Sequence, residues 1–219
     1  MFDATTVNMI WEGLLQTLYM TVLSTVLAYV IGLPLGVLLV TSAKDGIAPH
    51  PVLYKVLDVI VNIMRSIPFL ILLIAIMPLT RLIVGTTIGP NATIVPLVIA
   101  AFPFVARMVE SSLKEVSPGL IEAALSLGAS PMQIVTKVLV PEALPSLTVG
   151  AAIAVTTILG YSAMAGIVGG GGLGDIAIRY GYYRYETGIM VVTVVLLVVV
   201  VQIFQEIGMK LASHEDKRK

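Results

Sequence analysis

GLLQTLYMTVLSTVLAYVIGLPLGVLLVTSA, residues 13–43, is a stretch without a single charged side chain. It lies between Glu12 and Lys44 and consists mainly of Leu, Val and other apolar residues. A helix that crosses the hydrocarbon core of a bilayer needs about 20 such residues. The stretch therefore predicts a transmembrane helix, long enough to tilt or to protrude from the bilayer.

The composition of the whole chain agrees with a membrane protein. Of the 219 residues, 58% are hydrophobic and only 12% are charged, and the mean hydropathy is +1.00. An average soluble domain has about 25% charged residues. The formal net charge is zero, so no attraction to nucleic acid is expected. The absence of cysteine excludes disulfides and thiolate chemistry. The length suits one domain, and we expect residues 1–219 to form a single membrane domain.

Further uncharged stretches predict further spans, all of them helical because lipid cannot satisfy open backbone groups. The expected fold is all-α with five spans, near residues 13–41, 56–79, 90–106, 144–168 and 187–208. The second is the weakest, because Asp58 and Arg65 precede its uncharged part. An arginine inside a span is costly unless it is paired or faces a cavity. We expect Arg65 to pair with Asp58, Glu110 or a backbone carbonyl; contact with a substrate carboxylate is the alternative.

The basic residues predict the orientation, because cytoplasmic loops carry an excess of Lys and Arg. With the N-terminus outside, the cytoplasmic side receives Lys44, Lys55, Arg107, Lys114, Lys137, Lys210, Lys217, Arg218 and Lys219. The outer side receives only Arg81, Arg179 and Arg184. The C-terminus and the loop over residues 107–143 are therefore expected in the cytoplasm. No Lys or Arg precedes Lys44, so a cleaved signal peptide is not expected.

This cytoplasmic loop contains the signals of two short helices. Ser117 followed by Pro118 is typical of a helix start, with Ser as N-cap and Pro in the first turn. Gly128 suits the left-handed conformation that ends a helix. Together these residues predict a first helix that runs to Leu127.

A second helix is predicted directly after the glycine. Ser130 and Gln133 form the S-x-x-Q pattern of a capping box around Pro131. Apolar residues between 134 and 139 recur at helical spacing, and Pro141 is expected to close the helix. Three interpretations compete for this helix pair. It could be an interfacial loop resting on the spans, a DNA-binding helix-turn-helix, or a docking element for a cytoplasmic partner. The helix-turn-helix is disfavoured because phosphate binding needs more positive charge.

The pattern E-A-A at residues 122–124, followed by Gly128 and Pro141, resembles the EAA loop of the permease subunits of binding-protein-dependent ABC importers. In that family the loop sits in a cleft of a separate ATPase subunit and couples its closure to the membrane helices. Family members usually end the loop with I-x-L-P, whereas this chain has V-L-V-P at 138–141, a conservative departure. The resemblance implies a cytoplasmic coupling loop over residues 117–141. The residues it assigns to ATPase coupling are Glu122, Ala123, Ala124, Gly128, Ala129 and Pro141.

Nearly the whole chain is similar to the methionine uptake permeases within that class. The motifs that carry this similarity are RSIPF (65–69), RLIVGTTIG (81–89), FPFVARMVE (102–110), GYSAMAG (160–166) and GGLGD (171–175). The similarity implies a type I ABC importer permease with its transmembrane domain over about 13–208, in the bacterial cytoplasmic (inner) membrane. It further implies a homodimer, two copies of an ABC ATPase subunit, and an extracytoplasmic methionine-binding protein. The implied substrate is methionine (D or L); another amino acid or small solute is the alternative.

The chain itself is expected to be no enzyme and to bind no cofactor. It contains no G-x-x-x-x-G-K-[ST] loop, so ATP and Mg are expected on the partner ATPase. The run GGGGLG at 169–174 formally matches G-x-G-x-x-G, but it follows a span rather than a strand. We expect it to be a flexible outer turn, or a place of close backbone packing. His50 and His214 are isolated in the sequence, so no metal site is expected.

Two features inside the spans have structural or functional interpretations. Gly32 and Gly36 predict close helix packing or a kink. In the fourth span, candidates for the translocation pathway are Tyr161, Ser162 and Met164. The flexible thioether of Met164 can close a narrow apolar passage and rearrange; simple core packing is the alternative.

Two other classes of membrane protein fit less well. A self-sufficient secondary transporter would need internal repeats and intramembrane acids for ion coupling. An integral-membrane enzyme would need His, Asp or Glu residues that converge within the spans. The sequence has neither feature.

Overall fold

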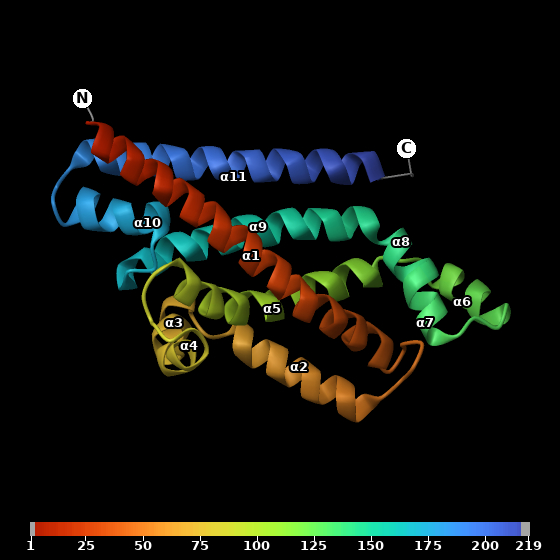
Figure 1. The fold of residues 1–219 in the computed structure, drawn as a ribbon. Coiled ribbons are helices and arrows are strands. Elements are labelled where there is room, and N and C mark those ends of the chain that lie inside the picture. The colour runs from red at the N-terminus through yellow and green to blue at the C-terminus, as the bar shows by residue number, and fades with distance from the viewer. Residues whose placement is uncertain (1–2, 216–219) are drawn as a thin grey trace. The chain divides into compact units, whose positions relative to one another are not determined.

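The computed structural model describes residues 3–215, apart from the side chain of Glu215, and these residues fold into helices joined by short turns (Figure 1). No strand occurs among them. The α-helices are α1 (Ala4–Ser42), α2 (Pro51–Arg65), α3 (Phe69–Ala75), α4 (Met77–Val84), α5 (Pro90–Lys114), α6 (Pro118–Ser126), α7 (Pro131–Ile134), α8 (Val140–Glu142), α9 (Leu144–Ala165), α10 (Gly172–Ile176) and α11 (Thr187–Glu215). Between them lie the π-helical turns η1 (Val135–Leu139) and η3 (Ala177–Tyr182) and the 3₁₀ turn η2 (Gly166–Val168). Lys217, Arg218 and Lys219, which entered the expected orientation, lie outside the described residues.

The described part of the chain contains four helical segments that are long and apolar enough to cross a membrane. They are Ala4–Ser42, Pro90–Lys114, Leu144–Tyr182 and Thr187–His214. A fifth span results if α2 and α3 are counted as one bent pair. The all-α architecture and the five-span interpretation are thereby supported, although several helices extend beyond the ranges expected from the sequence.

The expected continuous helix over residues 56–79 is corrected by the structure. α2 and α3 are bent by 99° at the break between them, and α4 follows after a further interruption. Pro68 has no backbone N–H, and its ring disfavours a helical conformation at Ile67. One Pro in the middle of an apolar stretch is therefore enough to break the span, and hydropathy alone does not detect this.

The chain divides into two compact units, to which α1, α5, α9 and α11 each contribute residues. The first unit comprises residues 1–27, 67–101 and 154–205. The second comprises residues 28–66, 102–153 and 206–219. The expected coupling loop lies entirely in the second unit.

In the first unit, the glycine run 169–174 is packed against other backbone rather than forming a flexible outer turn. The amide of Leu173 donates to Thr17 Oγ1 at 2.8 Å, and the amide of Gly172 donates to Gln16 Oε1 at 2.9 Å. The Thr93 hydroxyl donates to the Gly170 carbonyl at 3.1 Å. Gly170 to Gly174 are buried. Close backbone approach, one of the two expectations, is therefore what the glycines permit.

In the second unit, α1 packs closely against α5 through Gly32 and Gly36, as the spacing predicts. A Cβ on Gly32 would lie 2.7 Å from Val105 Cγ1, and one on Gly36 would lie 2.6 Å from Val109 Cβ. Both distances are too short for a real side chain, so glycine is required at each position. Beside this contact, Leu39, Val61 and Ala106 form a buried cluster. The sequence Gly-x-x-x-Gly correctly indicated a close helix interface.

Candidate functional site

The first helix of the expected coupling loop, α6, begins and ends where the sequence predicts. Ser117 occupies the N-cap position and Pro118 the first turn, but the Ser117 side chain makes no capping hydrogen bond. The fixed φ of Pro118 is thus the feature that favours the start of this helix. The helix ends at Ser126 with Leu127 as C-cap.

Gly128 turns the chain between the two helices through a left-handed backbone conformation with φ of +76°. Its amide donates to the Leu125 carbonyl at 2.9 Å, and the Ala129 amide donates to the Ala124 carbonyl at 3.1 Å. This pair of bonds is a Schellman motif. No atom lies within 4 Å of the position that a Cβ on Gly128 would take. Glycine is therefore favoured here by backbone conformation and not by space.

The capping box at the second helix, α7, is confirmed. The Ser130 amide donates to Gln133 Oε1 at 2.8 Å, and the Gln133 amide donates to Ser130 Oγ at 3.4 Å. The two side chains thus satisfy two amides that a helix start leaves without partners. This box and the glycine turn together fix the chain path between α6 and α7 (Figure 1).

The expectation that Pro141 closes the second helix is wrong. The chain instead passes from α7 through the π-turn η1 into α8, where Pro141 lies in the first turn. Pro141 cannot donate to the Lys137 carbonyl, and its ring would clash with that group in a regular helix. The wider π-turn, in which the Val140 amide donates to the Val135 carbonyl, accommodates this position. Helical hydrogen bonding then continues into α9, because Leu147 donates to Ala143 at 2.8 Å.

The inner face of the second helix is apolar and buried, as its spacing predicts, and the tip of the loop is exposed. Ile134, Val135 and Leu139 are buried. At the tip, the side chains of Leu127 and Met132 are 88% and 70% exposed. These two apolar residues flank the Gly128 turn and can contact a partner without any rearrangement of the loop.

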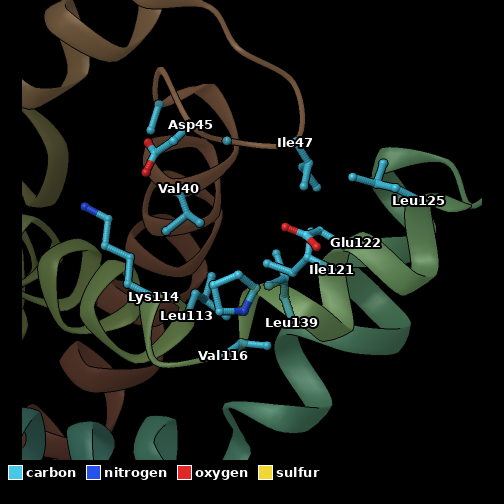
Figure 2. Close-up of a pocket in the computed structure, with 13 residues that line it drawn as sticks. Val40, Asp45, Ile47, Leu113, Lys114, Val116, Ile121, Glu122, Leu125 and Leu139 are labelled. Atoms are coloured by element: carbon cyan, nitrogen blue, oxygen red, sulfur yellow. The ribbon is translucent and has the colours of Figure 1, made fainter.

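A pocket of about 360 Å³ lies against α6, and Glu122 is one of the residues that line it. Its apolar walls come from the end of α1, the end of α5, α6 and η1. Figure 2 shows the Glu122 carboxylate between Ile121 and Ile47, on the side of α6 that faces the turn after α1. Of the residues assigned to coupling, the structure therefore places Glu122 on a different side of the loop from the apolar tip.

An ion-pair network connects α2 to the end of α5, and it corrects the partners expected for Arg65. Arg107 pairs with Asp58, with Glu110 at 2.5 Å, and with the Asn62 side chain at 2.9 Å. Lys114 adds a second cation on Glu110 at 2.7 Å. Asp58 and Glu110 thus bind Arg107 instead of Arg65. Glu110 follows Arg107 by three residues and precedes Lys114 by four, and this helical spacing was the signal that could have shown it.

The three pathway candidates on α9 do not share one environment. The Tyr161 ring stacks on Phe69 with centroids 4.5 Å apart. Ser162 is buried, and its hydroxyl donates to the Leu159 carbonyl at 2.7 Å. Met164 is 46% exposed. Tyr161 and Met164 lie on one side of the helix and Ser162 on another, so at most two of the three can face a common passage.

Comparison with known proteins places the chain in a family. Residues 32–208 match the family described as "Binding-protein-dependent transport system inner membrane component". The chain belongs to this family. As a member of the binding-protein-dependent transport system inner membrane components, with its long apolar helices, it is a multi-pass inner-membrane protein.

Named relatives within the family share about half of their residues with this chain. It is 55% identical to the "Probable D-methionine transport system permease protein MetI" of Vibrio cholerae, over 93% of this chain and 90% of the relative. It is 53% identical to the "D-methionine transport system permease protein MetI" of Escherichia coli K12, over 72% of this chain and 74% of the relative.

Solved structures agree with the sequence comparison. A structure titled "Inward facing conformations of the MetNI methionine ABC transporter" matches with a TM-score of 0.97 and 48% identity, covering 99% of this chain and 100% of the matched one. "Crystal structure of an amino acid ABC transporter with histidines" matches with a TM-score of 0.74 and 21% identity, which shows the same fold alone. The fold is that of a type I ABC importer permease.

Proposed function

We propose that this chain is the membrane-spanning subunit of an ATP-driven importer that brings methionine into the cytoplasm. The observation that carries the proposal is the match to the methionine transporter structure at 48% identity over 99% of the chain. Support also comes from the relative that is 55% identical and is named a D-methionine permease. The chain has no phosphate-binding loop of its own. It therefore hydrolyses no ATP, and the energy comes from a separate ATPase subunit.

In this proposal the chain works as a homodimer with two ATPase subunits and an extracytoplasmic methionine-binding protein. The N-terminus lies outside and the C-terminus in the cytoplasm. ATP and Mg bind to the ATPase subunits and none of the chemistry occurs on this chain. The binding protein delivers the amino acid to the outer face, and the spans alternate between states open to one side or the other.

The loop over residues 117–141 transmits the motion of the ATPase in this mechanism. The exposed apolar side chains of Leu127 and Met132 form its contact surface, and Glu122 adds a charge on another side of the loop. The Schellman motif and the capping box fix the angle between α6 and α7. Because η1 and α8 connect α7 to α9 by helical hydrogen bonds, a displacement of the tip moves the base of α9 as well. A loop with an unfixed end would dissipate the same displacement.

Reconstituted transport tests the proposal. The chain, its ATPase and the binding protein are placed in proteoliposomes, and uptake of radiolabelled D- and L-methionine is followed with and without ATP. We expect uptake that requires ATP and the binding protein. An ATPase variant that binds ATP without hydrolysing it serves as the control. Uptake of methionine without ATP would indicate a secondary transporter, and ATP-dependent uptake of a different amino acid only would refute the assignment of methionine.

A further inference from the structure

Arg65 is the last residue of α2, it is exposed, and its guanidinium has no hydrogen-bond or ion-pair partner among residues 3–215. The carboxylates that could neutralise it are already bound. Asp58 pairs with Arg107, and Glu110 is shared by Arg107 and Lys114. A cation in a membrane-spanning segment that lacks a partner requires another explanation.

Arg65 lies away from the side of α2 that carries its exposed apolar residues. The large exposed apolar residues of this helix follow one stripe, which includes Val56, Val59 and Ile63. Arg65 is nine residues after Val56, which places it about half a turn away from that stripe. It lies seven residues after Asp58, within about 20° of it around the helix axis. Arg65 therefore shares the side of α2 on which Asp58 meets Arg107, and it lies about two helical turns further along the helix.

The backbone next to Arg65 also indicates contact with water. α2 ends at Arg65, and the chain bends by 99° before α3 begins at Phe69. Ser66, Ile67 and Pro68 in the break are exposed. Non-helical backbone at membrane depth is tolerated only where it is buried in protein or lines a water-filled cavity. Broken spans of this kind commonly form the substrate sites of transporters.

We propose that Arg65 faces the translocation pathway and binds the carboxylate of the transported amino acid; this inference rests on the proposed function. The guanidinium is a planar fork of donors that matches a carboxylate with two parallel hydrogen bonds. The guanidinium is a cationic donor group without acceptors, so the site attracts the carboxylate of an amino acid. Arg65 is thus a residue that selects for amino acids rather than for neutral solutes.

The test uses the complete complex of this chain, its ATPase and the binding protein in proteoliposomes. Arg65→Gln removes the charge, whereas Arg65→Lys keeps the charge and loses the fork. Lys55→Gln on the same helix is the matched control, because Lys55 is an exposed cation on another side of α2. We expect Arg65→Gln to lower methionine uptake by about tenfold or more, in line with the loss of a charge-assisted contact. Arg65→Lys should fall between Arg65→Gln and wild type, and Lys55→Gln should stay within about twofold of wild type.

Assembly and basal ATP hydrolysis are measured on the same samples. Normal co-purification, an unchanged unfolding midpoint and basal hydrolysis within about twofold of wild type, together with lost uptake, support the inference. Unchanged uptake in Arg65→Gln would overturn it. Loss of the dimer or of bound ATPase would also overturn it, since Arg65 would then contact the second copy or the ATPase instead of the substrate. If the wild-type complex takes up no methionine, the proposed function itself fails. This result differs from failure of the inference on Arg65, because it is seen without any variant.

Discussion

Glu110 is a buried carboxylate whose side chain is only 5% exposed, and two cations hold it. Arg107 is the less exposed of the two cations, and it also links Glu110 to Asp58 on α2. Breaking a buried ion pair by removing one member leaves an uncompensated charge. Lys114 is the weaker partner, because its side chain is 53% exposed and solvent screens the interaction. The contribution of each cation to stability therefore follows from its exposure.

Replacing Arg107 by Gln should destabilise the chain, and replacing Lys114 by Gln should have a small effect. We expect a loss of about 3 kcal/mol for Arg107→Gln and about 1 kcal/mol or less for Lys114→Gln. The unfolding midpoints of the two variants in the same detergent are the measurement. Equal shifts for the two variants would mean that Arg107 and Lys114 contribute alike and that burial does not govern this network.

Gly128 turns the chain from α6 to α7 in a left-handed conformation, and the proposed role of this turn in coupling can be tested with one substitution. A side chain in the left-handed conformation costs about 1 kcal/mol or more, so Gly128→Val should misalign α6 and α7. We expect the variant to insert in the membrane but to lose ATP-dependent uptake. Gly119→Val is the control, because Gly119 has no positive φ and only the Ser117 hydroxyl lies near it. Normal uptake in Gly128→Val would mean that the loop rests on the bilayer without transmitting force.

Glu122→Ala, measured in membranes prepared in the same way, separates the effect of the Glu122 charge from the effect of the angle between α6 and α7. The Glu122 carboxylate is exposed and does not hold α6 and α7 together, because the turn is fixed by backbone bonds and by Ser130 and Gln133. A milder loss of uptake than in Gly128→Val is therefore expected, and it is measured in the same uptake assay. An equal or greater loss would show that charge at the loop matters more than its angle.

Among the elements, η1 is one that local sequence patterns did not predict. The spacing of the apolar residues correctly placed Ile134, Val135 and Leu139 on a buried face. The proline rule then suggested an end at Pro141, since a proline commonly terminates a helix. A π-turn offers another solution, in which one extra residue is inserted and the helix continues. Which solution is used depends on packing against the rest of the second unit, and this is not encoded in the six or seven residues around the proline.

Removing the proline should allow a regular helix and shift its register. With Pro141→Ala, the amide of residue 141 can donate to the Lys137 carbonyl, so η1 can convert into α-helix. A change from π-helical to α-helical hydrogen bonding shifts the register by one residue, which would rotate α7 by about 100° relative to α9. We expect bound ATPase to be retained or weakened and methionine uptake to fall several-fold, measured on one membrane preparation. Pro145→Ala, in the first turn of α9, is the control and should have little effect, because Pro145 lies outside the π-turn η1. Full uptake in Pro141→Ala would show that the π-turn has no part in coupling.

For the whole molecule, the membrane class and the approximate spans followed from charge-free stretches alone. This succeeds because a bilayer imposes one length and one hydrogen-bonding rule on every span. The residue-level partners did not follow, as Arg65 and Arg107 illustrate. Both are arginines near the end of an apolar helix, and only the three-dimensional arrangement shows which one meets Asp58. The bend at Pro68 was likewise not predictable from the sequence, because its angle depends on the packing of the flanking helices.

The orientation of the molecule in the membrane gives the last prediction. The excess of basic residues near Lys114 and their scarcity on the side of Arg179 and Arg184 predict that the end of α5 lies in the cytoplasm. A reporter enzyme that is active only in the cytoplasm, fused after Lys114, should therefore be active, and the same reporter fused after Tyr180 should be inactive. A reporter active only outside should give the reverse pattern at the same two positions, which controls for expression. Because α9 is the one complete span between the two positions, they must lie on opposite sides. Cytoplasmic activity at Tyr180 would require a different number of spans and would remove the coupling loop from the side on which an ATPase could reach it.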